Sequence, residues 1–121
     1  MKRLMIQGTD DSPQIVLDKD SGTFEISGRS LPEDSASFFA PVLEWIREYS
    51  QSPNDSTIFV FKLEYFNTAS SKFIHDIMLS LQSVKNVSIC WCHREEDETT
   101  EEAGIEFSEQ INVPFNFKRY A

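Results

Sequence analysis

Apolar and polar positions follow two different patterns in the middle of the chain. Residues 57–66, Thr-Ile-Phe-Val-Phe-Lys-Leu-Glu-Tyr-Phe, form an apolar, β-branched and aromatic run, whereas the later apolar residues recur at 73, 74, 77, 78 and 81. The first pattern is typical of a strand and the second of one face of a helix. The polar hexapeptide Asn-Thr-Ala-Ser-Ser-Lys at 67–72 separates them. The sequence therefore predicts a strand, a turn and a helix.

Short strands are expected before this unit. Residues 14–18 and 23–27 have strand-like patterns, and the Lys-Asp-Ser-Gly turn between them predicts a β-hairpin in which Gly22 takes a positive φ. Residues 1–14 are polar and interrupted by glycine and proline, so we expect a surface arm or a short edge strand there.

The remaining segments alternate between helix and strand. Apolar residues at helical spacing predict a helix over 34–50, and 86–92 reads as a strand. A third helix is expected over 100–110, although Gly104 lowers its helix propensity. The apolar side chains that it offers for burial are Ala103, Ile105 and Phe107. Residues 113–118 then form an edge strand, because a proline there cannot donate to a neighbouring strand.

This order of elements predicts an α/β fold. Strands that alternate with helices imply right-handed crossovers and a mixed sheet of about five strands, with helices packed mainly on one side. A length of 121 residues suits a single domain over 1–121. The turn at 67–72 would then lie at the carboxyl end of a central strand, where ligand-binding and regulatory residues gather in such sheets.

Charge and hydropathy narrow the possible partners and the location. Eleven basic and twenty acidic residues give a formal net charge of −9, which disfavours nucleic acid and anionic membrane surfaces as partners. No apolar run approaches the roughly 20 residues that span a bilayer, and the first residues do not form a signal peptide. We therefore expect a cytoplasmic protein without membrane insertion.

No metal or cofactor site is predicted. Cys90 and Cys92 lie two apart in a strand, which fits disulfide geometry poorly, so we expect two reduced thiols packed in the core. His93 completes a Cys-x-Cys-His sequence, but the only other histidine is His75 and no second ligand cluster exists. The acidic block at 94–102 lacks the spacing and the glycine of an EF-hand and reads as solvated or partner-facing charge.

The hexapeptide carries the chemistry of a helix N-terminus. Asn67 or Thr68 can cap the helix, and a phosphate on a hydroxyl there would meet several unpaired backbone N–H groups. Lys72 would add a positive charge. Ser70 and Ser71 are alternative acceptors or sources of capping hydrogen bonds.

The residues on either side of the hexapeptide could have a structural or a functional role. Tyr65 and Phe66 are either exposed contact residues or part of the core. His75 and Asp76 suggest acid-base chemistry, but no nucleophile or metal framework surrounds them. We therefore assign both to the outer face of the helix.

Several segments spread along the chain form a recognisable set. The most specific is Tyr-Phe-Asn-Thr-Ala-Ser-Ser-Lys at 65–72. The others are Thr9–Ile15, Gly28–Asp34, Phe38-Phe39 with Pro41 and Trp45, Glu102–Gly104, and Pro114-Phe115. Together, and in this order, they resemble the SiaC family of bacterial regulatory phosphoproteins. Asp34 stands where the family usually has asparagine, and Ala69 where serine is frequent, and neither change removes the hydroxyl of Thr68.

The resemblance implies a fold similar to the anti-anti-sigma (STAS) domains and a partner switch controlled by phosphorylation. In the family a dedicated kinase phosphorylates the threonine of the Asn-Thr turn, here Thr68, and a PP2C-type phosphatase removes the phosphate. The unmodified form binds and activates a diguanylate cyclase, a GGDEF protein, and so acts on cyclic-di-GMP signalling in biofilm formation and aggregation. Around Thr68, the phosphosite environment or partner contacts are assigned to Tyr65, Asn67, Ser70, Ser71 and Lys72.

Other functions remain open from the residues alone. A STAS-like small-molecule or nucleotide-binding domain could use the turn as an anion cradle, although the turn has no glycine-rich loop. An anti-anti-sigma-type regulator of a kinase and sigma-factor module is a further alternative. An enzyme would need a catalytic constellation that the sequence does not offer.

Overall fold

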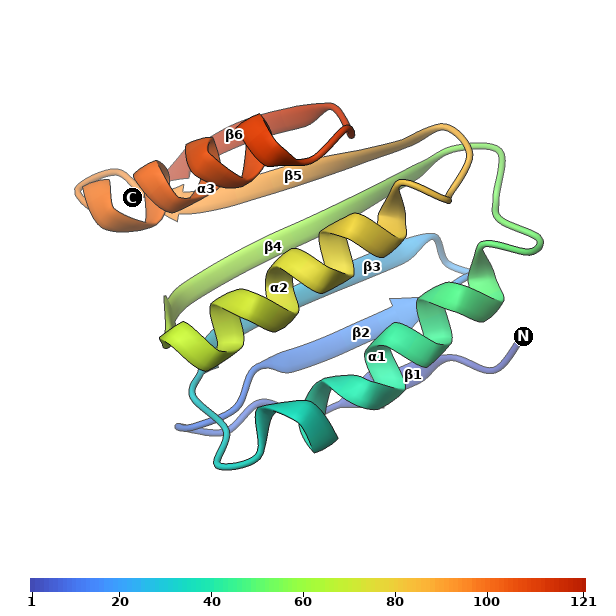
Figure 1. Ribbon diagram of the computed structural model, residues 1–121, viewed down its shortest axis with the longest axis horizontal. Helices are drawn as coiled ribbons and strands as arrows, with labels where there is room; N and C mark the ends of the chain where they lie inside the picture. Colours follow the sequence, from blue (N-terminus) through green and yellow to red (C-terminus); the bar gives the residue numbers. More distant parts are fainter.

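A six-stranded sheet and three helices make up the computed structural model, which describes residues 1–121 (Figure 1). The strands are β1 (Leu4–Ile6), β2 (Gln14–Asp18), β3 (Thr23–Ser30), β4 (Thr57–Phe66), β5 (Val87–Arg94) and β6 (Phe115–Tyr120). The helices are α1 (Ser35–Tyr49), α2 (Thr68–Leu81) and α3 (Glu98–Gln110). The strands lie in the sheet in the order in which they occur in the chain.

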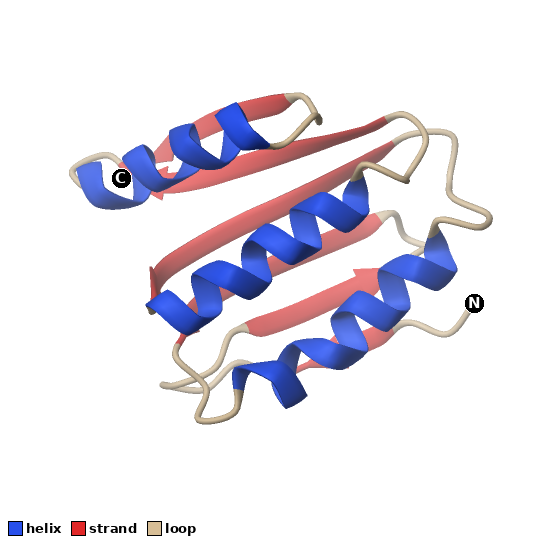
Figure 2. Ribbon diagram, in the orientation of Figure 1, coloured by secondary structure: helices blue, strands red, loops and turns tan.

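The sheet is mixed, as predicted. β1, β2 and β3 pair antiparallel, whereas β3 to β6 pair parallel, with one helix in each parallel connection. All three helices lie on the same face of the sheet, as right-handed crossovers require (Figure 2). The expected number of about five strands is one too low, because Leu4–Ile6 pairs with β2. Of the two alternatives for residues 1–14, a surface arm or a short edge strand, this part of the segment is the edge strand. β6 forms the other edge, as expected.

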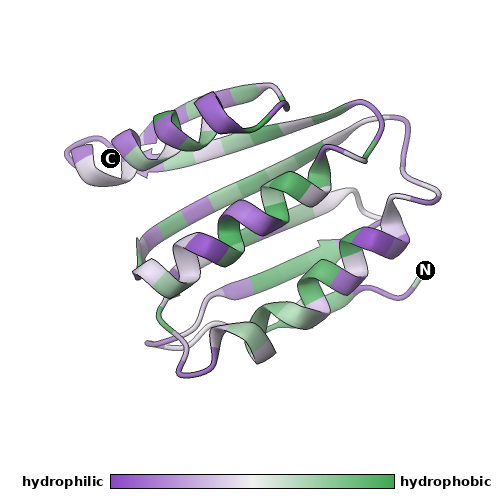
Figure 3. Ribbon diagram, viewed as in Figure 1, coloured by the Kyte–Doolittle hydropathy of each residue, from purple (hydrophilic) through white to green (hydrophobic).

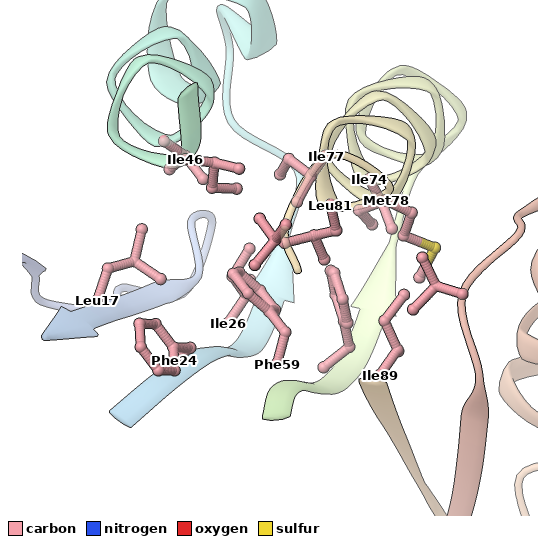
Figure 4. Close-up of a cluster of buried hydrophobic side chains, with 14 of the residues drawn as sticks. Leu17, Phe24, Ile26, Ile46, Phe59, Ile74, Ile77, Met78, Leu81 and Ile89 are labelled. Atoms are coloured by element: carbon pink, nitrogen blue, oxygen red, sulfur yellow. The ribbon is translucent and has the colours of Figure 1, made fainter. Parts of the chain in front are cut away.

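The core lies between the sheet and the helices. Along β4, Phe59 and Phe61 are buried beneath the helices, whereas Ile58 on the opposite face is 59% exposed. On α2, Ile77 and Met78 are fully buried and meet this layer (Figure 4). Hydrophobic residues follow α1, α2 and the strands beneath them, whereas α3 is mostly hydrophilic (Figure 3). No helix is both long and apolar enough to cross a membrane.

α3 begins two residues earlier than predicted, because Asp97 caps it. The Asp97 carboxylate accepts hydrogen bonds from the Thr100 N–H at 3.0 Å and from the Thr100 hydroxyl at 2.7 Å, and these bonds lower the pKa of Asp97. Of the three side chains offered for burial, only Phe107 is buried. Ala103 is half-buried, and Ile105 is 44% exposed.

Gly104 is a packing requirement of α3. A Cβ atom at this position would lie 2.3 Å from Cδ1 of the buried Trp91 ring. The same ring donates a hydrogen bond from Nε1 to the Thr100 carbonyl at 2.9 Å, which fixes the helix at close range. The low helix propensity of glycine is therefore tolerated here because only glycine lets α3 approach β5.

The two cysteines are free thiols, and Cys92 is buried as expected, but neither belongs to the hydrophobic cluster between the sheet and the helices. Cys90 and Cys92 face away from the helices, with Cys90 half-buried, Cys92 buried and the two Sγ atoms 3.7 Å apart. Burial, followed by the hydrogen bond with Cys90, raises the pKa of Cys92 to about 11. His93 points to the helix face, where its Nε2 is 3.8 Å from Glu101, so the Cys-x-Cys-His residues do not converge.

We expect Gly104→Ala to lower the free energy of unfolding by about 1–3 kcal/mol, the usual cost of overpacking a core. Helix propensity alone would change stability in the opposite direction, by about 1 kcal/mol. Urea unfolding followed by tryptophan fluorescence measures the difference, with Ser108→Ala on the same helix as the control. A Gly104→Ala protein that is as stable as the wild type would contradict the packing role.

Candidate functional site

The turn predicted over 67–72 is shorter in the structure, because α2 already begins at Thr68 and Asn67 alone links it to the carboxyl end of β4. Asn67 is the N-cap, because its Oδ1 accepts a hydrogen bond from the Ser70 N–H at 2.8 Å. This settles the choice between Asn67 and Thr68 as the capping residue. Thr68 is the first residue of the helix, and it is exposed. Its hydroxyl is therefore not required for capping, and the residue is exposed at a helix N-terminus, where backbone N–H groups lack helical acceptors.

Ser70 anchors the turn to the end of β3. Its side chain is fully buried and donates to the Ser30 carbonyl at 2.8 Å, while the Ser30 hydroxyl donates to the Ser70 Oγ at 2.8 Å. The same carbonyl also accepts the Asn67 N–H at 3.1 Å. Because both hydroxyls are buried and hydrogen-bonded, Ser70 is inaccessible as an acceptor and has a structural role.

A shift in register decides which aromatic side chain at the end of β4 is exposed. Gly28 pairs with Leu63, but the next residue of β3, Arg29, pairs with Tyr65, so Glu64 is an extra residue in β4. Regular alternation from the buried Leu63 would have turned Tyr65 inward. Instead Tyr65 is 48% exposed. The register shift therefore places an exposed tyrosine three residues before Thr68.

Phe66 points in the other direction. It is half-buried and packs against the core, with its ring 6.1 Å from the Trp91 ring in an edge-on arrangement. The sequence left open whether Tyr65 and Phe66 are exposed contact residues or part of the core, and each alternative holds for one of them. Tyr65 is exposed, and Phe66 belongs to the margin of the core.

Arg29 was not identified from the sequence as part of this surface. Its guanidinium lies 5.4 Å from the centre of the exposed Tyr65 ring, and its Nε donates to the Asp10 carbonyl at 3.1 Å. The contact is a cation–π interaction, which holds both side chains at the same edge of the sheet as the turn. Only the pairing of β3 with β4 brings Arg29 and Tyr65 together, so no local sequence signal predicts this contact.

Lys72 lies one helical turn beyond Thr68 and is exposed. Its ammonium is 5.3 Å from the centre of the Phe73 ring and forms no ion pair. Thr68 and Lys72 are four residues apart, a spacing that places them on the same side of α2. The lysine is therefore a free positive charge close to the predicted acceptor.

His75 and Asp76, which the sequence assigned to the outer face of the helix, are less exposed than that assignment predicts. Both are half-buried, and the His75 ring lies 6.2 Å from the Phe107 ring of α3. Between α2 and α3 there is an open groove of ≈ 380 Å³, which we call the α2/α3 groove. Its lining residues are Ser71, Lys72, His75, Ala103, Glu106, Phe107 and Gln110.

Comparison with known proteins gives one consistent result. The model of the SiaC family of regulatory phosphoproteins matches residues 6–120. An uncharacterized protein of Pseudomonas aeruginosa strain UCBPP-PA14 is 30% identical over 119 residues, which cover 95% of this chain and 94% of that protein.

Solved structures agree with this match. The structure of SiaC of Pseudomonas aeruginosa has a TM-score of 0.87 at 28% identity and covers 99% of this chain and 100% of its own. A crystal structure of the diguanylate cyclase SiaD in complex with its activator SiaC, from the same species, matches with a TM-score of 0.87 at 29% identity. It covers 97% of this chain and 99% of the matched chain.

We expect Asn67→Ala to lower the free energy of unfolding by about 1 kcal/mol, because the Ser70 N–H loses its acceptor at the start of α2. Asn67→Ser keeps a capping oxygen and serves as the matched control, with a much smaller loss. Urea unfolding measures both. Equal stability of Asn67→Ala and the wild type would contradict the capping role.

Proposed function

The chain belongs to the SiaC family of regulatory phosphoproteins, and from this premise we propose that it is a signalling adaptor controlled by reversible phosphorylation of Thr68. The adaptor has no turnover of its own and acts as one regulatory domain over residues 1–121. The observation that most supports Thr68 as the acceptor is that two of its neighbours have structural roles, whereas Thr68 has none. Asn67 caps α2 and Ser70 is buried, whereas Thr68 is exposed and free of structural hydrogen bonds to other side chains.

The partner of the unmodified form is a diguanylate cyclase with a GGDEF domain. This part of the proposal is supported by the similarity to SiaC, which is the activator of the cyclase SiaD in the matched complex. The adaptor binds and activates the cyclase, and thereby raises cyclic-di-GMP and favours biofilm formation and aggregation.

Phosphorylation acts at the surface rather than on the fold. A phosphate on Thr68 adds about −1.5 to −2 charges at neutral pH to a protein that already carries a formal charge of −9. The added charge is favourable at the N-terminus of α2, so α2 itself is not destabilised. The hydrogen bonds of Asn67 and Ser70 do not involve the Thr68 hydroxyl, so they persist. What changes is the charge that an approaching partner meets.

Two further proteins complete the switch. A cognate protein kinase adds the phosphate, and a PP2C-type phosphatase removes it. We place the adaptor in the cytoplasm, because the kinase needs ATP and the cyclase needs GTP. Tyr65, Asn67, Ser71 and Lys72 surround the acceptor and are the residues that kinase, phosphatase and cyclase would meet.

We expect incubation with ATP and the cognate kinase to add one phosphate to the wild type and to Ser71→Ala, but none to Thr68→Ala. Intact mass spectrometry measures the addition, and fragmentation locates it. Ser71→Ala is the matched control because it removes a neighbouring hydroxyl on the same side of the helix. A phosphate that persists on Thr68→Ala would contradict the assignment.

We expect the phosphorylated protein to bind the diguanylate cyclase of its own organism at least about 30-fold more weakly than the unmodified protein, which corresponds to about 2 kcal/mol. Thr68→Ala should bind about as tightly as the unmodified wild type and remain insensitive to the kinase. Titration calorimetry measures binding, and cyclic-di-GMP production measures activation. Equal binding of both forms would refute the switch.

A further inference from the structure

The face of the sheet that carries no helix presents the two thiols of the chain side by side. Along β5, Cys90 and Cys92 alternate with Ile89 and Trp91, which belong to the core, so both cysteines point away from the helices (Figure 2). Their Sγ atoms are 3.7 Å apart, with Cys92 buried and Cys90 half-buried. Neither the core nor the proposed phosphorylation switch uses these sulfurs.

A pocket of ≈ 340 Å³ opens onto both thiols. Val60 of β4, which pairs with Cys90 in the sheet, gives its lining an apolar part. Tyr120 of β6 also lines it, with the ring 4.7 Å from the Lys62 ammonium. The pocket therefore gives a small ion access to both sulfurs.

Two positive charges flank the thiols. Lys118 of β6 pairs with Cys92 in the sheet, and Lys62 of β4 lines the same pocket. Neither lysine has a carboxylate within ion-pair distance, and Glu25 is the only acidic residue of the lining. Two lysines against one glutamate leave the pocket with a net charge of +1, in a chain whose formal net charge is −9. Such a surrounding favours an anionic group at the sulfurs.

The separation of the sulfurs fits one metal ion held between them. A disulfide needs an S–S bond of about 2.05 Å, and two cysteines two apart on one strand fit its geometry poorly. Two sulfurs bound to one metal ion at about 2.3 Å and a tetrahedral angle are about 3.8 Å apart. The observed separation of 3.7 Å is close to this value. A wider angle at the metal needs only a rotation of the half-buried Cys90 side chain.

The number of ligands narrows the choice of ion. Thiolates bind copper(I), zinc and iron–sulfur clusters, and the last two use at least three protein ligands. The structure contains no group of three or more histidine, cysteine, aspartate or glutamate residues that could hold a metal ion. His93 cannot complete the pair, because it points to the helix face. Copper(I) is satisfied by two thiolates, and the resulting complex carries one negative charge, which matches the +1 of the pocket.

From these observations we propose that Cys90 and Cys92 form a binding site for one copper(I) ion on the open face of the sheet. Each sulfur forms one bond to copper and releases its thiol proton to solvent. Copper stays in the +1 state, so no oxidant or reductant takes part. Lys62 and Lys118 stabilise the negative charge of the complex from either side. The site lies on the other face of the sheet from α2, and the proposal does not rest on the proposed function.

Anaerobic titration of the full chain with copper(I) buffered by bicinchoninate, a chelator whose copper(I) complex is coloured, tests the proposal. We expect the wild type to take one copper(I) per chain from the chelator. Cys90→Ser and Cys92→Ser should each weaken binding at least about 100-fold, the upper end of what loss of an outer-shell partner costs. Lys118→Gln should weaken it about threefold, because one compensating charge is lost. His93→Gln is the matched control and should bind like the wild type, and thermal unfolding checks that each variant is folded.

X-ray absorption at the copper edge of the loaded wild type gives a readout that depends on no variant, and we expect two sulfur neighbours and no nitrogen. Failure of the wild type to take copper from the chelator would overturn the site, as would a Cys90→Ser protein that binds as tightly as the wild type. One copper per two chains, or loss of binding in a folded His93→Gln protein, would show a different set of ligands and contradict the proposal. Zinc bound at least as tightly in a parallel titration would overturn the choice of metal.

Discussion

The junction of Ser30, Asn67 and Ser70 holds the candidate site in place. One carbonyl at the end of β3 accepts both the Asn67 N–H and the Ser70 hydroxyl, and the Asn67 side chain caps the helix that follows. Because these groups are buried or half-buried and hydrogen-bonded to one another, the start of α2 is fixed to the sheet. Thr68 carries the exposed hydroxyl of this segment and takes no part in the side-chain hydrogen bonds of the junction. A modification there can change the surface without loosening the structure beneath it.

Sheet topology concentrates the other features around this junction. β3, β4 and β5 are parallel, so their carboxyl ends and the N-termini of the three helices lie at one edge. The extra residue in β4 turns Tyr65 outward beside Arg29 and keeps Phe66 on the core. On the other side of Thr68, α2 continues into the groove that it forms with α3. Thr68 therefore lies between the Arg29–Tyr65 pair and the α2/α3 groove, whose lining includes Lys72 and Glu106.

The sequence allowed much of the fold and the centre of the site to be predicted, because these depend on local signals. The change from a strand pattern to helical spacing located β4 and α2, and the polar hexapeptide located the turn. Long-range contacts could not be predicted. By helix propensity alone Gly104 is unfavourable in α3, and only the close approach of the Trp91 ring explains a glycine there. The exposure of Tyr65 depends on the pairing of Arg29 with it, and the groove depends on the distance between two helices, so neither has a local signature. The third residue of the junction, Ser30, lies forty positions from Ser70 and was missed for the same reason.

The central claim is that a phosphate on Thr68 changes the surface of the protein and leaves its fold intact. Two-dimensional ¹H–¹⁵N NMR spectra of the labelled protein, recorded before and after complete phosphorylation by the kinase, test it most directly. We expect amide shifts confined to the first two turns of α2, the ends of β3 and β4, and the walls of the α2/α3 groove. Shifts that spread through β2, β5 and α1, or a loss of dispersion, would show that phosphorylation rearranges the core, and would contradict a switch that acts through the surface alone.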